Sequence, residues 1–358
     1  MKSGYLYLLK ILKHSRRSDL RLGFTIVELL VVIVVIGLIA TITIVSYTGI
    51  QQKATVASLV SNLDSASKIL KMDQAVSGSY PTALAEANGG NGIPINTNTT
   101  YQYIVNNIPG SPAFCVTATK DAISYKITND KVPSLGTCLD FGLILHLDAS
   151  DTASYPGSGT AWTDLSGNSS NGTLAGGALY SIDGGGSMYF NGAGAYVDIP
   201  YASQYNIRNA ITISVWIKRT TGFEQTRDTM ILGRAPSWYF YDSYNSGQIR
   251  GEVFTNGARN GGIIASVPFD GFWYQITYTY DSETHIEKMY KNGVMVSSHT
   301  LPIMSNYLID SSISNFAPMG LNTVGRGMFL NDASVYNRAI TADEASLIFN
   351  NDKGRYGL

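Results

Sequence analysis

The feature that most constrains this chain is a run of 22 residues, Phe24 to Val45, that holds a single charged side chain, Glu28. A helix rises about 1.5 Å per residue, so this run would span roughly 33 Å, enough to cross a bilayer core of about 30 Å. Six Lys or Arg and one acidic residue lie in residues 1–23, ahead of the run. Because basic flanks stay on the cytoplasmic side of a membrane, we predict a single-pass helix with its N-terminus in the cytoplasm.

The order of these pieces is informative. An ordinary secretory signal has a shorter apolar run followed by its cleavage site, whereas here the sequence Arg21-Leu-Gly-Phe24 comes before the run. Together with LGFTIVELLVVIVVIG, this order resembles the N-terminal segment of type IV pilins and pseudopilins. The resemblance implies that residues 1–23 are a basic prepilin leader, and that a prepilin peptidase cuts between Gly23 and Phe24 and methylates the new amine.

Glu28 has two interpretations. Near the start of a membrane helix it would lie in the headgroup zone, where a carboxylate costs little. Ionisable residues in membrane spans are nevertheless rare and usually have a partner. In a filament of other pilin subunits, the resemblance implies that Glu28 pairs with the free amine of Phe24 of a neighbour and sets the register of assembly.

Residues 24–139 are predicted to form the pilin helix and a small β head. The apolar residues between Val56 and Leu70 recur at helical spacing, and Gly78 and Pro81 then end the helix. The two cysteines of the chain, Cys115 and Cys138, both fall in the head. We predict that they form a disulfide, which would stabilise the head by about 3 kcal/mol; a pair of free thiols and a metal site are the alternatives.

Residues 140–358 have a different composition, with all four Trp and no Cys. Alternating runs at 211–217 and 273–280, and a hairpin whose turn is Asn292-Gly293, predict an all-β antiparallel sandwich. A capping box at Thr341–Glu344 predicts a short final helix. The predicted fold class is an α+β pilin followed by an all-β antiparallel sandwich, which a further resemblance, described next, identifies as a jelly roll.

The same region resembles the laminin G-like, or concanavalin A-like, jelly-roll domains. The resemblance is carried by short pieces in order, among them LHLDA at 145–149, WTDLSGN at 162–168, YKNG at 290–293 and DASVYNRAIT at 332–341. Jelly rolls of this class often hold structural calcium, so the resemblance implies a calcium ion held by Asp332, at the head of the last strand, with Asp148 and the carbonyl of Gly192.

The sequence favours a binding protein over an enzyme. Glycosidases of this class place several carboxylates on one strand, facing the sugar, whereas Glu252 stands alone in its strand and Glu283 and Glu287 flank a turn, where solvated surface is the expectation. No catalytic motif is evident. A basic stripe for nucleic acid is also missing, since residues 24–358 carry a net charge of −6.

An aromatic stretch offers a candidate ligand site. Trp238, Tyr239 and Tyr241 lie within four residues, and flat aromatic rings stack on sugar faces. The alternative is that these rings fill the core of the sandwich.

Three functions compete. The first is a minor or tip pilin whose lectin-like domain adheres to a glycan or surface protein. The second is a structural pseudopilin of a secretion or DNA-uptake machine, and the third is a filament-tethered glycoside hydrolase. In each case the chain would reside in the inner membrane before assembly and then outside the cell.

Overall fold

The computed structural model describes residues 25–107, 110–191, 194–220, 228–234, 237–244, 246–260, 262–302, 306, 308–310, 319–320 and 327–358. The chain divides into two compact units, Met1–Ser58 and Leu59–Leu358. The predicted cleavage residues Gly23 and Phe24, and the leader before them, lie outside the described residues. The processing prediction therefore stays a prediction from sequence.

The first long element is helix α1, Ile26–Ser77. At its start the backbone N–H of Thr25 and its hydroxyl both donate to Glu28 Oε2, at 2.8 and 2.9 Å, and the N–H of Glu28 donates to Thr25 Oγ1. This reciprocal capping box fixes the helix start. The helix ends where the sequence predicts, because Gly78 adopts a φ of 82°. By length and composition α1 can cross a membrane.

A small antiparallel sheet follows, in the order β1-β2-β3-β4. Its helical turns and strands are η1 (Leu84–Glu86), α2 (Ala87–Gly90), β1 (Thr100–Asn106), β2 (Ala113–Lys120), β3 (Ile123–Thr128), β4 (Ser134–Leu135) and η2 (Cys138–Asp140). Its core joins the α1 stripe Leu59, Leu63, Ala66 and Leu70 to Phe114, Val116 and Ile127. The predicted disulfide is confirmed, since Cys115 and Cys138 are bonded and both fully buried.

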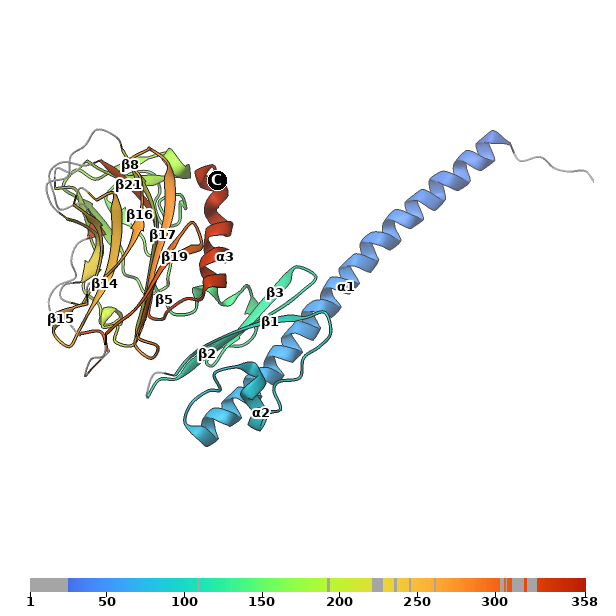
Figure 1. Ribbon diagram of the computed structural model, residues 1–358. Coiled ribbons are helices and arrows are strands. Elements are labelled where there is room, and N and C mark those ends of the chain that lie inside the picture. The colour runs from blue at the N-terminus through green and yellow to red at the C-terminus, as the bar shows by residue number, and fades with distance from the viewer. Residues whose placement is uncertain are drawn as a thin grey trace, which may run out of the picture. The chain divides into compact units, whose positions relative to one another are not determined.

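The rest of the chain is the predicted antiparallel sandwich (Figure 1). An eight-stranded sheet has the order β19-β18-β17-β11-β21-β9-β8, and β5 pairs with β21. Its strands are β5 (Leu143–Leu147), β8 (Leu179–Ser181), β9 (Ser187–Phe190), β11 (Ala210–Arg219), β17 (Trp273–Asp281), β18 (Ile286–Lys291), β19 (Val294–Thr300) and β21 (Met328–Tyr336).

Two further sheets complete the sandwich. The five-stranded sheet contains β12 (Thr229–Arg234), β13 (Trp238–Ser243), β14 (Gln248–Thr255), β15 (Ala258–Arg259) and β16 (Ile263–Ser266). The four-stranded sheet contains β6 (Ala161–Trp162), β7 (Gly172–Ala175), β10 (Tyr196–Asp198) and β20 (Met319–Gly320). Three single 3₁₀ turns lie between or after the strands: η3 (Asp183–Gly185), η4 (Ser203–Tyr205) and η5 (Lys353–Tyr356).

Local signals in the sandwich are confirmed. Asn292 and Gly293 have φ values of 52° and 75° and join β18 to β19. Thr341 and Glu344 form the predicted capping box of α3, Ala342–Asp352. This helix lies beside β19, where Gly293 approaches Phe349 (Figure 1). The hydrophobic core of the sandwich runs from Ile144 to Val335 in sequence and shares no residue with the core of the small sheet.

Candidate functional site

One group of charged side chains gathers where β5, β21 and the C-terminal turn η5 meet. His146 Nε2 lies 2.9 Å from Asp332 Oδ1. The guanidinium of Arg355 donates from Nη1 to Asp148 Oδ2 at 2.6 Å and lies, through Nη2, 3.3 Å from Asp332 Oδ2. Both aspartate side chains are 8% exposed. We call these four residues the carboxylate cluster.

The backbone around Asp332 differs from the expectation. Asp332 lies in the middle of β21 and not at its head, because the strand begins at Met328. The pairing of β21 with β11 shifts register between Ser214 and Trp216, opposite this point. Asp332 itself has a φ of 47°, the left-handed region that few residues other than glycine and Asn or Asp adopt. A bulge at this position therefore directs the carboxylate toward His146 and Arg355.

Arg355 is held in place by its neighbour in sequence. The ring of Tyr356 stacks on Trp216 with centroids 3.8 Å apart, and its hydroxyl accepts a hydrogen bond from Asn331 Nδ2 at 3.0 Å. Sequence reasoning missed Arg355, which lies 207 residues from Asp148. No local pattern links residues at that distance.

Electrostatics hold the carboxylate cluster together. Burial opposes the charged form of His146, but its hydrogen bond to Asp332 and the charges of Asp332 and Asp148 outweigh burial, so the pKa of His146 is raised. Burial likewise opposes the charged form of Asp148, but hydrogen bonds from Ser150 and Arg355 lower its pKa. Burial and the charge of Asp332 raise the pKa of the adjacent Asp352 to about 7.

The cluster also contains two of the three predicted metal ligands, Asp148 and Asp332, together with His146, which was not predicted as a ligand. One ligand atom from each of His146, Asp148 and Asp332 lies within 4.8 Å of the others, a spacing that could surround an ion. Calcium prefers oxygen donors, however, and an imidazole is a poor ligand for it. Arg355 already supplies positive charge to both carboxylates. Gly192 lies outside the described residues, so calcium stays a prediction that competes with Arg355 for the same oxygens.

The predicted aromatic ligand site is corrected in two of its three residues. Trp238 is 0% exposed and belongs to the sandwich core, and Tyr241 is 5% exposed. Neither ring offers an open face to a sugar. The alternative that these rings fill the sandwich core is confirmed for Trp238, whereas Tyr241 is buried outside the core cluster, beside Glu252 and Arg259. Tyr239 is half-buried. It points away from Trp238 because side chains alternate along β13.

Tyr239 belongs to a second charged group on the outward face of the five-stranded sheet. Ladder pairing sets Tyr239 beside Glu252 and Phe254 beside Arg259. Glu252 is 1% exposed, and Arg259 donates to its Oε1 from Nε at 2.7 Å and from Nη2. We call this group the arginine–tyrosine cluster, and its members are Tyr239, Tyr241, Arg250, Glu252, Phe254 and Arg259.

One acidic residue was misplaced by sequence reasoning. Glu287 is fully buried, whereas Glu283 is exposed as expected. Glu287 accepts a hydrogen bond from the hydroxyl of Tyr278 at 2.7 Å and lies 3.3 Å from His299 Nδ1. The turn that precedes it predicts exposure, but Glu287 already lies within β18, on the side that faces the core.

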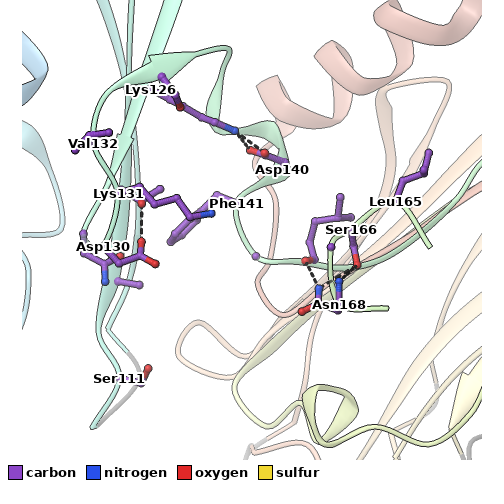
Figure 2. Close-up of a pocket in the computed structure, with 17 residues that line it drawn as sticks. Ser111, Lys126, Asp130, Lys131, Val132, Asp140, Phe141, Leu165, Ser166 and Asn168 are labelled. Carbon is purple, nitrogen blue, oxygen red and sulfur yellow. Dashed lines mark hydrogen bonds and ion pairs between the residues drawn. The ribbon is translucent and has the colours of Figure 1, made fainter. Parts of the chain in front are cut away.

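A polar hollow of about 630 Å³ is lined in part by Lys126, Asp140, Ser166 and Asn168 (Figure 2). Several of its polar groups pair with one another. Lys126 Nζ lies 2.5 Å from Asp140 Oδ2, and Asn168 Nδ2 donates to Ser166 Oγ at 3.0 Å. We assign it no ligand.

Comparison with known proteins addresses the sandwich. Residues 190–346 match a laminin G-type family model described as the concanavalin A-like lectin/glucanases superfamily. No curated protein matches the chain in sequence.

Solved structures with a similar arrangement include two toxin fragments. The binding domain of Paraclostridial Mosquitocidal Protein 1 is 17% identical, with a TM-score of 0.48 over 60% of this chain and 53% of that one. The receptor binding domain of botulinum neurotoxin C/D mosaic serotype is 13% identical, with a TM-score of 0.49 over 59% of this chain and 52% of that one. The chain thus spans about half the length of these structures. Residues 190–346 are thus similar to the concanavalin A-like lectin/glucanases superfamily, and the observed sheets form an antiparallel sandwich, consistent with a jelly roll, after a long N-terminal helix.

Proposed function

We propose that this chain is a subunit of a type IV pilus-like filament, which displays its jelly-roll domain outside the cell for adhesion to a glycan or a surface protein. The observation that carries the proposal is the two-part character of α1. Between Ile26 and Ile42 its large apolar side chains are 47–84% exposed, on every face of the helix. From Leu59 to Leu70 only one stripe is apolar, and that stripe is buried in the core of the small sheet.

An apolar surface around the whole helix requires an apolar solvent or other helices. A bilayer supplies the first before assembly, and a bundle of subunits supplies the second in a filament. The polar groups in this part are adapted to such surroundings: the hydroxyls of Thr41 and Thr43 donate to backbone carbonyls of their own helix. Cleavage after Gly23 would leave α1 intact, since the helix begins at Ile26.

The capping box defines the test of assembly. Only Oε2 of Glu28 accepts hydrogen bonds from Thr25 among the described residues, which leaves Oε1 to meet the amine of a neighbouring subunit. Glu28→Gln and Glu28→Leu variants should insert and lose their leader at the normal rate, yet incorporate at least tenfold less into sheared filaments. Thr25→Val is the matched control, because it disturbs the same cap and keeps the carboxylate. Full incorporation of both Glu28 variants would contradict the proposal.

Display for adhesion is preferred to the hydrolase alternative. Glu252 is engaged by Arg259 through two N–H groups, so it is not poised to give a proton to a leaving group. Adhesion is tested by binding of purified filaments to arrayed glycans and surface proteins, with filaments that lack residues 140–358 as the control. A structural pseudopilin would show no difference between the two.

A further inference from the structure

We infer that the arginine–tyrosine cluster is a binding site for a carboxylate-bearing saccharide. The inference rests on the proposed adhesive function and names the ligand chemistry for it. It starts from the alternation of β13 and β14. Trp238 and Phe240 on β13, and Ile249 and Val253 on β14, lie in the sandwich core. The residues that alternate with them, Tyr239 on β13 and Arg250 and Glu252 on β14, must therefore face outward.

The outward face holds a buried carboxylate, which is unusual for the solvent side of a sheet. Glu252 is 1% exposed, and a Cβ placed on Gly262 would lie 2.9 Å from the Cβ of Glu252, so the backbone of Gly262 covers this side chain closely. A buried charge is expensive unless it is paired. Arg259 pairs with it directly, and Arg250 Nε lies 3.6 Å from Glu252 Oε2.

Charge is not balanced in this cluster. Two guanidinium groups face one carboxylate, and both arginines reach solvent, with side chains 52% exposed for Arg259 and 32% for Arg250. Among the residues that the structure describes, the Nη groups of Arg250 and Nη1 of Arg259 donate no hydrogen bond, whereas Arg250 Nε is buried against Glu252. The cluster therefore keeps a net positive charge and unused N–H donors, as a site for an anion requires.

The donors are held in position rather than free to move. Arg259 Nη2 also lies 3.2 Å from the hydroxyl of Tyr241, and burial together with the charge of Glu252 raises the pKa of that hydroxyl to about 12. The guanidinium of Arg259 lies 5.7 Å from the ring centroid of Tyr239 and 5.9 Å from that of Phe254. A cation fixed against rings in this way loses little conformational freedom when it binds a carboxylate.

The rings of Tyr239 and Phe254 would contact the apolar face of the sugar, while the arginines bind its carboxylate. Tyr239 and Phe254 are half-buried and meet edge to face, with centroids 5.0 Å apart. Aromatic faces stack on the C–H surface of a sugar ring, and the adjacent guanidinium groups can take a carboxylate that the same sugar carries. A neutral sugar would use the rings alone. The site should therefore prefer a uronic or sialic type of residue over its neutral analogue.

The test uses the full-length protein in detergent micelles and three probes: a sialic acid-terminated oligosaccharide, its neutral parent without that acid, and an Asp/Glu-rich peptide. We expect the acidic sugar to bind at least tenfold tighter than the neutral one, with affinity that falls as salt rises. Arg250→Gln leaves the Glu252–Arg259 pair in place and should lower affinity for the acidic sugar tenfold or more. Lys288→Gln, the same loss of charge on β18, should leave affinity unchanged.

A second variant guards against misfolding. Arg259→Gln alone would leave Glu252 with only the longer contact to Arg250, at 3.6 Å. The paired change Glu252→Gln with Arg259→Gln removes both charges and should also abolish the preference for the acidic sugar. Equal binding of acidic and neutral sugars, or no effect of Arg250→Gln, would overturn the inference. Tighter binding of the acidic peptide would overturn the saccharide assignment. If none of these probes and no surface protein binds, the adhesive function fails with it, whereas neutral-sugar binding unaffected by Arg250→Gln leaves adhesion standing.

Discussion

The carboxylate cluster and the arginine–tyrosine cluster both pair buried carboxylates with arginines, but in opposite proportions. In the first, Asp148 and Asp332 share the single guanidinium of Arg355, and the pair of carboxylates is the buried component. In the second, one buried carboxylate, Glu252, is shared by Arg250 and Arg259. In the carboxylate cluster, the two acids occupy the guanidinium of Arg355, which links distant segments of the chain. Where arginines outnumber the acid, donors remain for a ligand.

The comparison predicts its largest effect for Arg355→Met. Among the described residues, the change leaves two nearly buried carboxylates beside each other with His146 as their remaining cationic partner. Leaving buried charge without its partner costs about 3–5 kcal/mol. We expect thermal unfolding, followed by circular dichroism, to show a loss of this size. Lys353→Met, in the same turn, is the control and should change the midpoint little.

The Arg355→Met variant also tests the calcium prediction. Without Arg355 the oxygens of Asp148 and Asp332 are open to a cation, so millimolar calcium should restore part of the lost stability, as any ligand that binds only the folded state does. Asp332→Ala in that background should remove the rescue. If calcium instead raises the midpoint of the wild type as much as that of the variant, Arg355 does not occupy the ion's place.

A smaller loss is expected for Arg259→Gln. Glu252 keeps Arg250 as a partner at 3.6 Å, so the cost should be about 1–3 kcal/mol, the penalty of an imperfectly satisfied buried polar group. Adding Glu252→Gln should recover most of it, as measured by denaturant unfolding. A double variant less stable than Arg259→Gln would show that Glu252 has contacts more important than its arginines.

The smallest effect concerns Glu287, a buried carboxylate whose partners among the described residues are His299 and Tyr278 and not an arginine. Burial raises its pKa above 4.5, against hydrogen bonds from Tyr278 and His299, and the charge of Glu252 adds to the rise. A raised pKa in the folded state means that protonation favours folding. The contribution of Glu287 to the free energy of unfolding is therefore fully present below pH 4.5 and is lost as the pH rises through the raised pKa.

The Glu287→Gln variant cannot ionise at this position, so it should not lose stability as the pH rises through the raised pKa of Glu287. Its stability relative to wild type should rise with pH across this window. Denaturant unfolding at a series of pH values measures the difference, and Glu283→Gln, an exposed glutamate in the adjacent turn, is the matched control. A wild-type profile that runs parallel to that of Glu287→Gln would mean that the carboxylate does not titrate in this range.

The sequence by itself determined the features that depend on neighbours along the chain. The apolar run and Gly78 bounded α1, Asn292-Gly293 set the hairpin turn, and Thr341 with Glu344 began α3, because caps and turns are decided by the backbone within a few residues. The disulfide was also predictable, since the chain has two cysteines.

Only the tertiary structure decided which side of each strand is buried. Alternation separates Trp238 from Tyr239, but the sequence does not say which of the two meets the opposite sheet. For the same reason the sequence predicted Glu287 to be exposed, whereas the structure places it in the core. The partners of Asp148 and Glu252 were undetermined for a related reason: Arg355 and Arg259 reach them through the folding of the C-terminal turn and the β14–β15 turn. A buried charge needs a partner, but which distant residue supplies it depends on the path of the whole chain.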